Sequence, residues 1–215
     1  RCHSGAFFLE PLLQHLDKLQ FDILLYHNHP AVDNVSDRLR SHAVLWRNFV
    51  GQADPSVEAA IRADAPDVLF DLSGHTGFNH LPLFARRLAP LQITYLGYPD
   101  TTGLDTMDRR FTDGHADPAG QSKLFATEKL VRFSTCAWTY QPPGGIPLPV
   151  RPAPEPNRPV SFGCFNNLSK LNTPTLRLWA RLLDAVPNSR LVLKTIGLSP
   201  ALFTENLLAA GLDRV

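Results

Sequence analysis

The strongest chemical signal in the sequence is the segment NNLSK, which ends at Lys170 and precedes a helical pattern. Thr173 is a favourable N-cap residue for that helix, and Pro174 suits the first helical position. A helix that begins there presents free N–H groups and the positive end of its dipole just after the Lys170 ammonium, and all of these favour anionic oxygens. We therefore predict that Asn166, Asn167, Lys170 and Thr173 bind a phosphate or diphosphate group. Turn-capping asparagines and an ordinary surface lysine are the alternative.

A second group of candidate residues occupies loops that follow predicted strands. The loop 73–77 (SGHTG) follows a strand pattern at 68–72, and the loop 97–103 (GYPDTTG) follows one at 91–96. Loops at the carboxyl ends of parallel strands gather at one edge of a sheet, where ligands bind. The residues expected at this edge are His3, His75, Thr76, Pro99, Thr101 and Thr102. Glycine-rich turns after strands are common, so each residue alone also has a structural interpretation.

Metal binding is a weaker alternative. His27 and His29 resemble half of a metal site, but no third ligand follows at useful spacing, and turn residues explain the pair at least as well. A metallohydrolase built on this pair would hold stoichiometric zinc. No Asp-x-Asp pair occurs in the sequence, which favours neutralisation of a leaving diphosphate by protein cations and helix dipoles. We expect no metal and no cofactor.

The elements that must position these residues alternate between strand and helix patterns. Strands are predicted at 21–26, 68–72, 91–96, 109–112 and 130–133, and helices at 5–19, 35–42, 56–64 and 79–88, with Ser4 and Asp54 as caps. The apolar run at 21–26 (FDILLY) is typical of a strand covered on both faces. Strands separated by helices of this length imply right-handed crossovers and a mostly parallel sheet. The predicted fold class is α/β.

A proline-rich segment divides the chain. Proline supplies neither ladder donors nor helix interiors, so residues 140–159 are expected to form an extended, semi-rigid linker. Residues 1–139 are then one α/β domain, and residues 160–215 begin a second, with strands at 160–165 and 190–194 and helices at 175–186 and 201–210. Both domains are expected to be incomplete, because the alternation starts and stops abruptly.

Composition and charge argue against several classes of protein. A hydrophobic fraction of 44% and a charged fraction of 19% are typical of folded proteins. The net charge of +1 gives no electrostatic reason to expect nucleic acid as a partner. No apolar run in the sequence reaches the roughly 20 residues that a membrane helix needs. Three cysteines without paired spacing favour a reducing, cytoplasmic setting.

Taken together, these motifs resemble the catalytic region of the O-GlcNAc transferase family, including its bacterial and plant members. The matching segments are HS at 3–4, FLEPLL at 8–13, DLSGHT at 71–76, LFARR at 83–87, LGYP at 96–99, TTG at 101–103, EKL at 128–130, FGCFNNLSK at 162–170 and VPNSRL at 186–191. The resemblance implies a GT-B fold of two Rossmann-like domains. It also implies inverting transfer of N-acetylglucosamine from UDP-GlcNAc to Ser or Thr hydroxyls of proteins, with no required metal. Tetratricopeptide repeats are expected in the full-length chain.

The resemblance also implies roles for individual residues. Lys170 matches a family lysine that contacts the donor pyrophosphate, and Asn167 matches its polar neighbour. His3 matches a loop histidine near the donor phosphate and the acceptor, and it stays open whether this residue is a base or a phosphate ligand. Asp100 and Ser169 depart from the family pattern, which adds a negative charge near the phosphate site and removes a stacking contact.

The resemblance further implies that the second domain is only begun here. A His-Thr-Thr phosphate loop and the uridine contacts are expected beyond residue 215, so the chain alone is expected to be inactive. A non-catalytic module of the same fold that binds a nucleotide sugar or a peptide is the alternative function.

Overall fold

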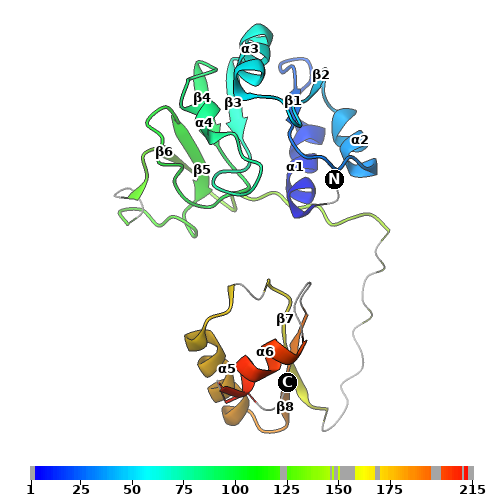
Figure 1. Cartoon of the computed structure of the whole chain (residues 1–215), viewed down its shortest axis with the longest axis vertical. Coiled ribbons are helices and arrows are strands. Elements are labelled where there is room, and N and C mark those ends of the chain that lie inside the picture. The colour runs from blue at the N-terminus through cyan, green and yellow to red at the C-terminus, as the bar shows by residue number, and fades with distance from the viewer. Residues whose placement is uncertain are drawn as a thin grey trace. The chain divides into compact units, whose positions relative to one another are not determined.

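The computed structural model describes residues 3–121, 125–145, 147, 150, 158–167, 170–194, 200–209 and 211–212. The chain forms two compact units, Arg1–Pro147 and Leu148–Val215 (Figure 1). Much of the expected linker at 140–159 lies outside the described residues, as does Ser169. The boundaries of the two predicted domains therefore stay a prediction.

The first unit alternates helices and strands in the predicted manner. Its elements are α1 (Ser4–His15), β1 (Leu24–His27), α2 (Asn34–Arg40), β2 (Leu45–Asn48), α3 (Asp54–Asp64), β3 (Val68–Asp71), α4 (Leu81–Phe84), β4 (Leu91–Thr94), β5 (Arg109–Asp113) and β6 (Lys129–Phe133). A parallel pair is formed by β1 and β2, and a parallel sheet by β3, β4, β5 and β6 in that order (Figure 1). Because β3 and β4 run parallel, the loops that follow them leave the same edge.

The main core of the first unit packs between the sheet, α3 and α4. Its buried members are Phe49, Val57, Ile61, Leu69, Leu81, Leu83, Phe84, Leu88, Ala89 and Met107. Strand β3 alternates between buried and exposed residues, with Val68 40% and Phe70 44% exposed. The strand expected at 21–26 begins only at Leu24, as β1, and all four of its residues are half-buried.

Two predicted helix caps are also wrong, because both helices start earlier than expected. His3 rather than Ser4 is the N-cap of α1, where its Nδ1 atom accepts a hydrogen bond from the Gly5 amide at 3.1 Å. Helix α3 begins at Asp54 itself, with Ala53 as an N-cap that makes no side-chain hydrogen bond. Pro55 fixes the backbone of that first turn, so the helix forms without a side-chain cap.

Two further differences come from polar side chains. Strand β2 has no counterpart among the predicted strands, because Arg47 and Asn48 interrupt its apolar pattern. The helix predicted at 79–88 shortens to α4, and the chain beyond it is held by the fully buried Gln92. The side-chain amide of Gln92 donates through Nε2 to the Phe84 carbonyl at 2.9 Å, and its Oε1 accepts from the backbone N–H of Leu88 at 3.0 Å. The side chain therefore takes the place of helical hydrogen bonds.

The second unit repeats the strand–helix alternation at small scale. Strands β7 (Val160–Cys164) and β8 (Ser189–Leu193) pair in parallel, and the helices are α5 (Thr173–Ala185) and α6 (Pro200–Ala209) (Figure 1). Its core consists of Leu176, Leu183, Leu191, Leu207 and Leu212. Among the described residues of either unit, no helix has the length and apolar character needed to cross a membrane.

Candidate active site

A buried carboxylate organises the turn that follows β3. The Asp71 side chain is 3% exposed and accepts hydrogen bonds from the amides of Ser73 at 3.0 Å and Gly74 at 3.0 Å. Asp71 also accepts a hydrogen bond from the Thr94 hydroxyl at 2.7 Å, on the adjacent strand β4. One side chain therefore ties the ends of two strands together and starts the turn that carries His75.

The loops after β3 and β4 pack closely against each other. A Cβ atom on Gly97 would lie 2.0 Å from the Leu72 carbonyl oxygen, and one on Gly74 would lie 2.2 Å from Cβ of Tyr98. Gly74 also has a φ of +51°, which favours glycine. The predicted meeting of these two loops at one edge of the sheet is confirmed, and the glycines are what permit it.

His75 reaches from the first loop to the second. Its Nε2 atom lies 3.0 Å from the Thr102 carbonyl oxygen, and its ring meets the Tyr98 ring edge-on at 5.2 Å between centroids. A carbonyl oxygen only accepts hydrogen bonds, so Nε2 carries the ring proton and Nδ1 is the acceptor of the neutral ring. The Thr76 hydroxyl, by contrast, donates to the Ser73 carbonyl at 2.7 Å within its own turn.

Thr101 and Thr102 are held by a buried carboxylate from outside the loop. Glu128, which is 4% exposed, accepts hydrogen bonds from the Thr102 amide at 2.6 Å and from the Thr102 hydroxyl. Its other oxygen accepts from the Thr101 hydroxyl at 2.8 Å. Burial raises the pKa of Glu128, but the hydrogen bonds from Thr102 and Thr101 outweigh that effect and hold the pKa below its usual range.

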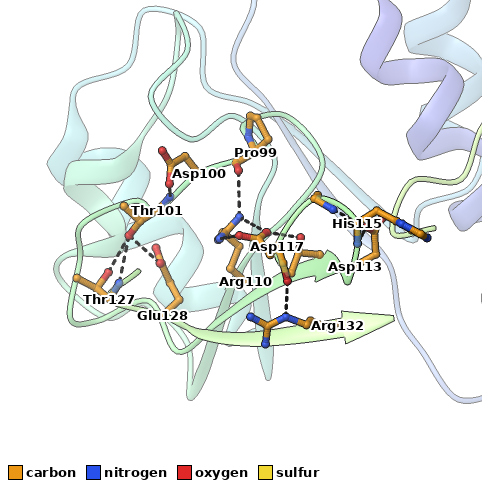
Figure 2. Close-up of polar contacts among 12 residues, drawn as sticks. Pro99, Asp100, Thr101, Arg110, Asp113, His115, Asp117, Thr127, Glu128 and Arg132 are labelled. Carbon is orange, nitrogen blue, oxygen red and sulfur yellow. Dashed lines mark hydrogen bonds and ion pairs between the residues drawn. The ribbon is translucent and has the colours of Figure 1, made fainter. Parts of the chain in front are cut away.

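A buried ion pair holds the other part of the loop. The Arg110 guanidinium donates to both carboxylate oxygens of Asp117, at 3.0 and 2.8 Å, and to the Pro99 carbonyl at 3.0 Å (Figure 2). Asp117 also accepts from the Thr112 hydroxyl, and its carbonyl accepts from Arg132 Nε at 2.7 Å. Pro99 is therefore positioned through its backbone, whatever its ring contributes to the turn.

Asp100, which was expected to depart from the family pattern, lies between these two groups. Its carboxylate accepts a hydrogen bond from the Thr101 amide at 2.7 Å (Figure 2). The Asp100 carboxylate therefore has a local role in shaping the loop.

His3 and the His27–His29 pair have structural partners of their own. His3 is exposed and uses Nδ1 to cap α1, so this nitrogen is unprotonated in that contact. His27 stacks on Trp46 at 5.1 Å, and His29 Nδ1 accepts from the Ala31 amide at 3.0 Å. Within the described residues, no group of three or more His, Cys, Asp or Glu side chains is arranged to hold a metal ion.

The predicted phosphate-binding segment lies in the second unit. Asn166, Asn167 and Lys170 are exposed after strand β7, and the Lys170 amide donates to the Asn167 carbonyl at 3.0 Å. Thr173 is not the N-cap of α5, and that prediction is wrong. Asn172 occupies the cap and accepts from the amide of Thr175 at 3.0 Å. Thr173 is instead the first helical residue, because Asn172 is an even better cap than threonine.

The structure adds four charged residues that sequence reasoning did not assign to the site: Asp71, Arg110, Asp117 and Glu128. Each is buried, and buried charges of this kind are rare unless they are paired or hydrogen-bonded. Asp71 and Glu128 lie inside segments already matched to the family, but neither burial nor partner is visible in a single sequence.

The chain matches the family model described as glycosyl transferase family 41 over residues 47–140. It is 41% identical over 199 residues to a Solanum lycopersicum protein named "Probable UDP-N-acetylglucosamine--peptide N-acetylglucosaminyltransferase SPINDLY", covering 89% of this chain and 21% of that protein. An Arabidopsis thaliana protein with the same enzyme name and the suffix SEC is 29% identical over 171 residues, covering 75% and 17%. The chain thus spans about a fifth of the length of the curated relatives it matches.

A solved structure extends the match to three dimensions. A lysine-to-methionine mutant of the Thermobaculum terrenum O-GlcNAc transferase superposes with a TM-score of 0.89 and 38% sequence identity, over 99% of this chain and 41% of that one. This match, with the parallel sheets, confirms the predicted α/β class and its GT-B type. Sequence and fold agree that the chain belongs to glycosyl transferase family 41.

Proposed function

We propose that this chain is part of the catalytic region of an inverting glycosyltransferase that moves N-acetylglucosamine from UDP-GlcNAc to Ser or Thr hydroxyls of proteins. The names of the relatives support the donor and a peptide acceptor. The observation that carries the proposal is the placement of Lys170 between a parallel strand and the start of α5, in a chain of this family.

The chemistry needs charge stabilisation at the leaving group. As an acceptor hydroxyl attacks the anomeric carbon, the bond from that carbon to the diphosphate oxygen breaks, and negative charge grows on UDP. The Lys170 ammonium and the free N–H groups at the start of α5 stabilise that charge. The first turn of α5 contains no acidic residue that would repel an anion. Asn166, Asn167 and Thr173 supply polar groups to the same segment.

The first unit supplies the imidazoles. In the proposed function His3 acts near the donor phosphate and acceptor, either as the base or as a phosphate ligand. His75, Thr76, Pro99, Thr101 and Thr102 line the cleft edge. The His75 Nδ1 acceptor and the hydroxyls of the loop are suited to hold sugar hydroxyls or an amide group.

The test is UDP release from UDP-GlcNAc by the intact protein, with and without an acceptor peptide. Lys170→Met should lower turnover by about a hundredfold or more, the usual cost of losing one preorganised charge-stabilising donor. Lys18→Met, which removes an exposed charge next to α1, should leave turnover unchanged. Turnover of Lys170→Met close to that of the unsubstituted protein would remove Lys170 from the mechanism.

The same assay separates the alternatives. Donor binding without UDP release by an intact, folded protein would favour a non-catalytic binding module. Preference for a different nucleotide sugar in a donor panel would overturn the UDP-GlcNAc assignment, and loss of activity in EDTA would overturn the expectation that no metal is needed.

Tetratricopeptide repeats as a recruiting partner and a cytoplasmic setting are part of the proposal, the latter supported by free Cys136 and Cys164.

A further inference from the structure

We propose that Glu128 is a positioning residue, which holds the His75 imidazole in place through the peptide bond between Thr102 and Gly103. That His75 takes part in glycosyl transfer rests on the proposed function above. The positioning itself rests on a chain of hydrogen bonds in the first unit that runs from Glu128 through Thr101 and Thr102 to His75, and it can be tested without any catalytic activity.

The first contacts hold Thr102, the residue whose carbonyl belongs to this peptide. Glu128 accepts from the Thr102 amide at 2.6 Å and from the Thr102 hydroxyl with one carboxylate oxygen. Thr102 is itself 3% exposed, so water does not compete easily for these bonds. Thr102 is therefore held by the carboxylate of the residue immediately before β6.

The second set fixes the far side. The other Glu128 oxygen accepts from the Thr101 hydroxyl at 2.8 Å, which commits the single proton of that hydroxyl. The Thr101 oxygen is then left to accept, and it accepts from the Gly103 amide at 3.1 Å. It also accepts from the Thr127 amide at 3.2 Å (Figure 2). A missing or shortened partner at residue 128 would free that proton and weaken this arrangement.

The two sets meet in one rigid plane. The Gly103 N–H and the Thr102 carbonyl belong to the same peptide unit, which is planar, so fixing the N–H direction fixes the carbonyl direction. That carbonyl is the partner of His75 Nε2 at 3.0 Å. Glu128 therefore determines where the ring proton of His75 points and leaves Nδ1 as the acceptor for a ligand.

A separate clamp keeps this proposal testable. Arg110 holds the Pro99 carbonyl at 3.0 Å independently of Glu128. Substitution of Glu128 therefore leaves the loop anchored at Pro99, and it should misplace the Thr102–Gly103 peptide without releasing the whole loop.

The experiment is NMR of the 215-residue chain with 15N-labelled histidine and backbone. In the unsubstituted chain, the His75 Nε2–H proton should be observed directly, and the Thr102 and Gly103 amides should exchange slowly with solvent. Glu128→Asp and Glu128→Ala should lose the Nε2–H signal and the protection of both amides. Glu128→Gln, which keeps the length and one acceptor oxygen, should restore a measurable part of both. Glu10→Ala, which breaks an exposed ion pair with Arg38 on α1, should change neither.

Retention of the His75 signal in a folded Glu128→Asp or Glu128→Ala chain would overturn the proposal. So would an Nδ1–H tautomer in the unsubstituted chain, a result that does not depend on any variant folding. In the intact protein, Glu128→Asp should lower turnover roughly tenfold to a hundredfold through misplacement of His75. Unchanged turnover with a lost signal would refute the catalytic part, whereas an intact protein that transfers no sugar refutes the proposed function and leaves the NMR result to decide the positioning.

Discussion

The Arg110–Asp117 pair allows a quantitative prediction, because it is a buried ion pair with a surface counterpart in the same unit. The side chains of Arg110 and Asp117 are only 4% and 10% exposed. Asp117→Ala removes the two carboxylate oxygens that accept from the guanidinium and the partner of the Thr112 hydroxyl, which leaves a buried charge without its counter-ion. Loss of one partner of such a pair costs about 3–5 kcal/mol.

The expected loss converts to a measurable shift in melting temperature. For a chain of this size, each kcal/mol lowers the midpoint by about 2–4 °C, so Asp117→Ala should melt roughly 6–20 °C below the unsubstituted chain. Circular dichroism melts and urea unfolding measure the change. The matched control is Glu10→Ala, because Glu10 and Arg38 form the same two-point contact at 3.0 and 3.1 Å with Arg38 48% exposed. That exposed pair should contribute only about 0.2–1 kcal/mol.

A double variant tests the reason for the loss. Arg110→Met with Asp117→Leu removes both charges and keeps apolar volume, so it should be more stable than Asp117→Ala alone. If Asp117→Ala costs no more than Glu10→Ala, the pair is not desolvated and the reasoning fails. If the double variant is less stable than the single one, the cost lies in the hydrogen bonds to Pro99 and Thr112 and not in the unpaired charge.

Three further predictions follow from single contacts. Gly97→Ala should lower the melting temperature, because its Cβ would lie 2.0 Å from the Leu72 carbonyl oxygen, whereas Gly77→Ala, which meets nothing within 4 Å, should not. Asn172→Ala should cost about 0.5–2 kcal/mol in urea unfolding by removing the cap of α5, and Asn172→Asp should keep most of it; equal losses would show that the cap is not the cause. Burial raises the pKa of Glu128, but the hydrogen bonds from Thr102 lower it by more, so the net pKa lies below the usual 4.5. Its stabilising effect is therefore present above pH 4.5 and lost as the pH falls through the folded-state pKa, and Glu128→Gln should flatten this acid limb in melts recorded across that range.

The order of elements and the meeting of two loops were within reach of the sequence. The alternation of apolar runs and helical patterns predicts the parallel strands, and the rule for loops at strand ends places His75 near Thr102, although the two are 27 residues apart. Where a polar residue replaces backbone hydrogen bonds, the same reasoning fails. Gln92 shortens a predicted helix, and Arg47 conceals a strand, because neither contact is local in sequence.

The charged residues of the site were out of reach for a related reason. Glu128 and Thr102 are 26 residues apart, and nothing in either segment marks one as the partner of the other. A carboxylate in a sequence is most simply interpreted as a surface charge, and only the fold shows it to be buried. The histidine near the start of the chain shows a contact that the sequence did not indicate. His3 has the chemistry of a catalytic base, and the structure also gives it an ordinary role as a helix cap.

The loop 97–103 is held largely through hydrogen bonds to its main chain, at the Pro99 carbonyl, the Thr102 amide and the Thr102 carbonyl. The side chain of Asp100 lies between these anchor points and is exposed. Residue 100 is therefore a natural position for protein engineering: a library of substitutions there would vary the charge that the loop presents and would remove only the contact with the Thr101 amide, while the three anchor points stay in place. A search for altered substrate selectivity can begin at this residue, without changes to the side chains that hold the loop.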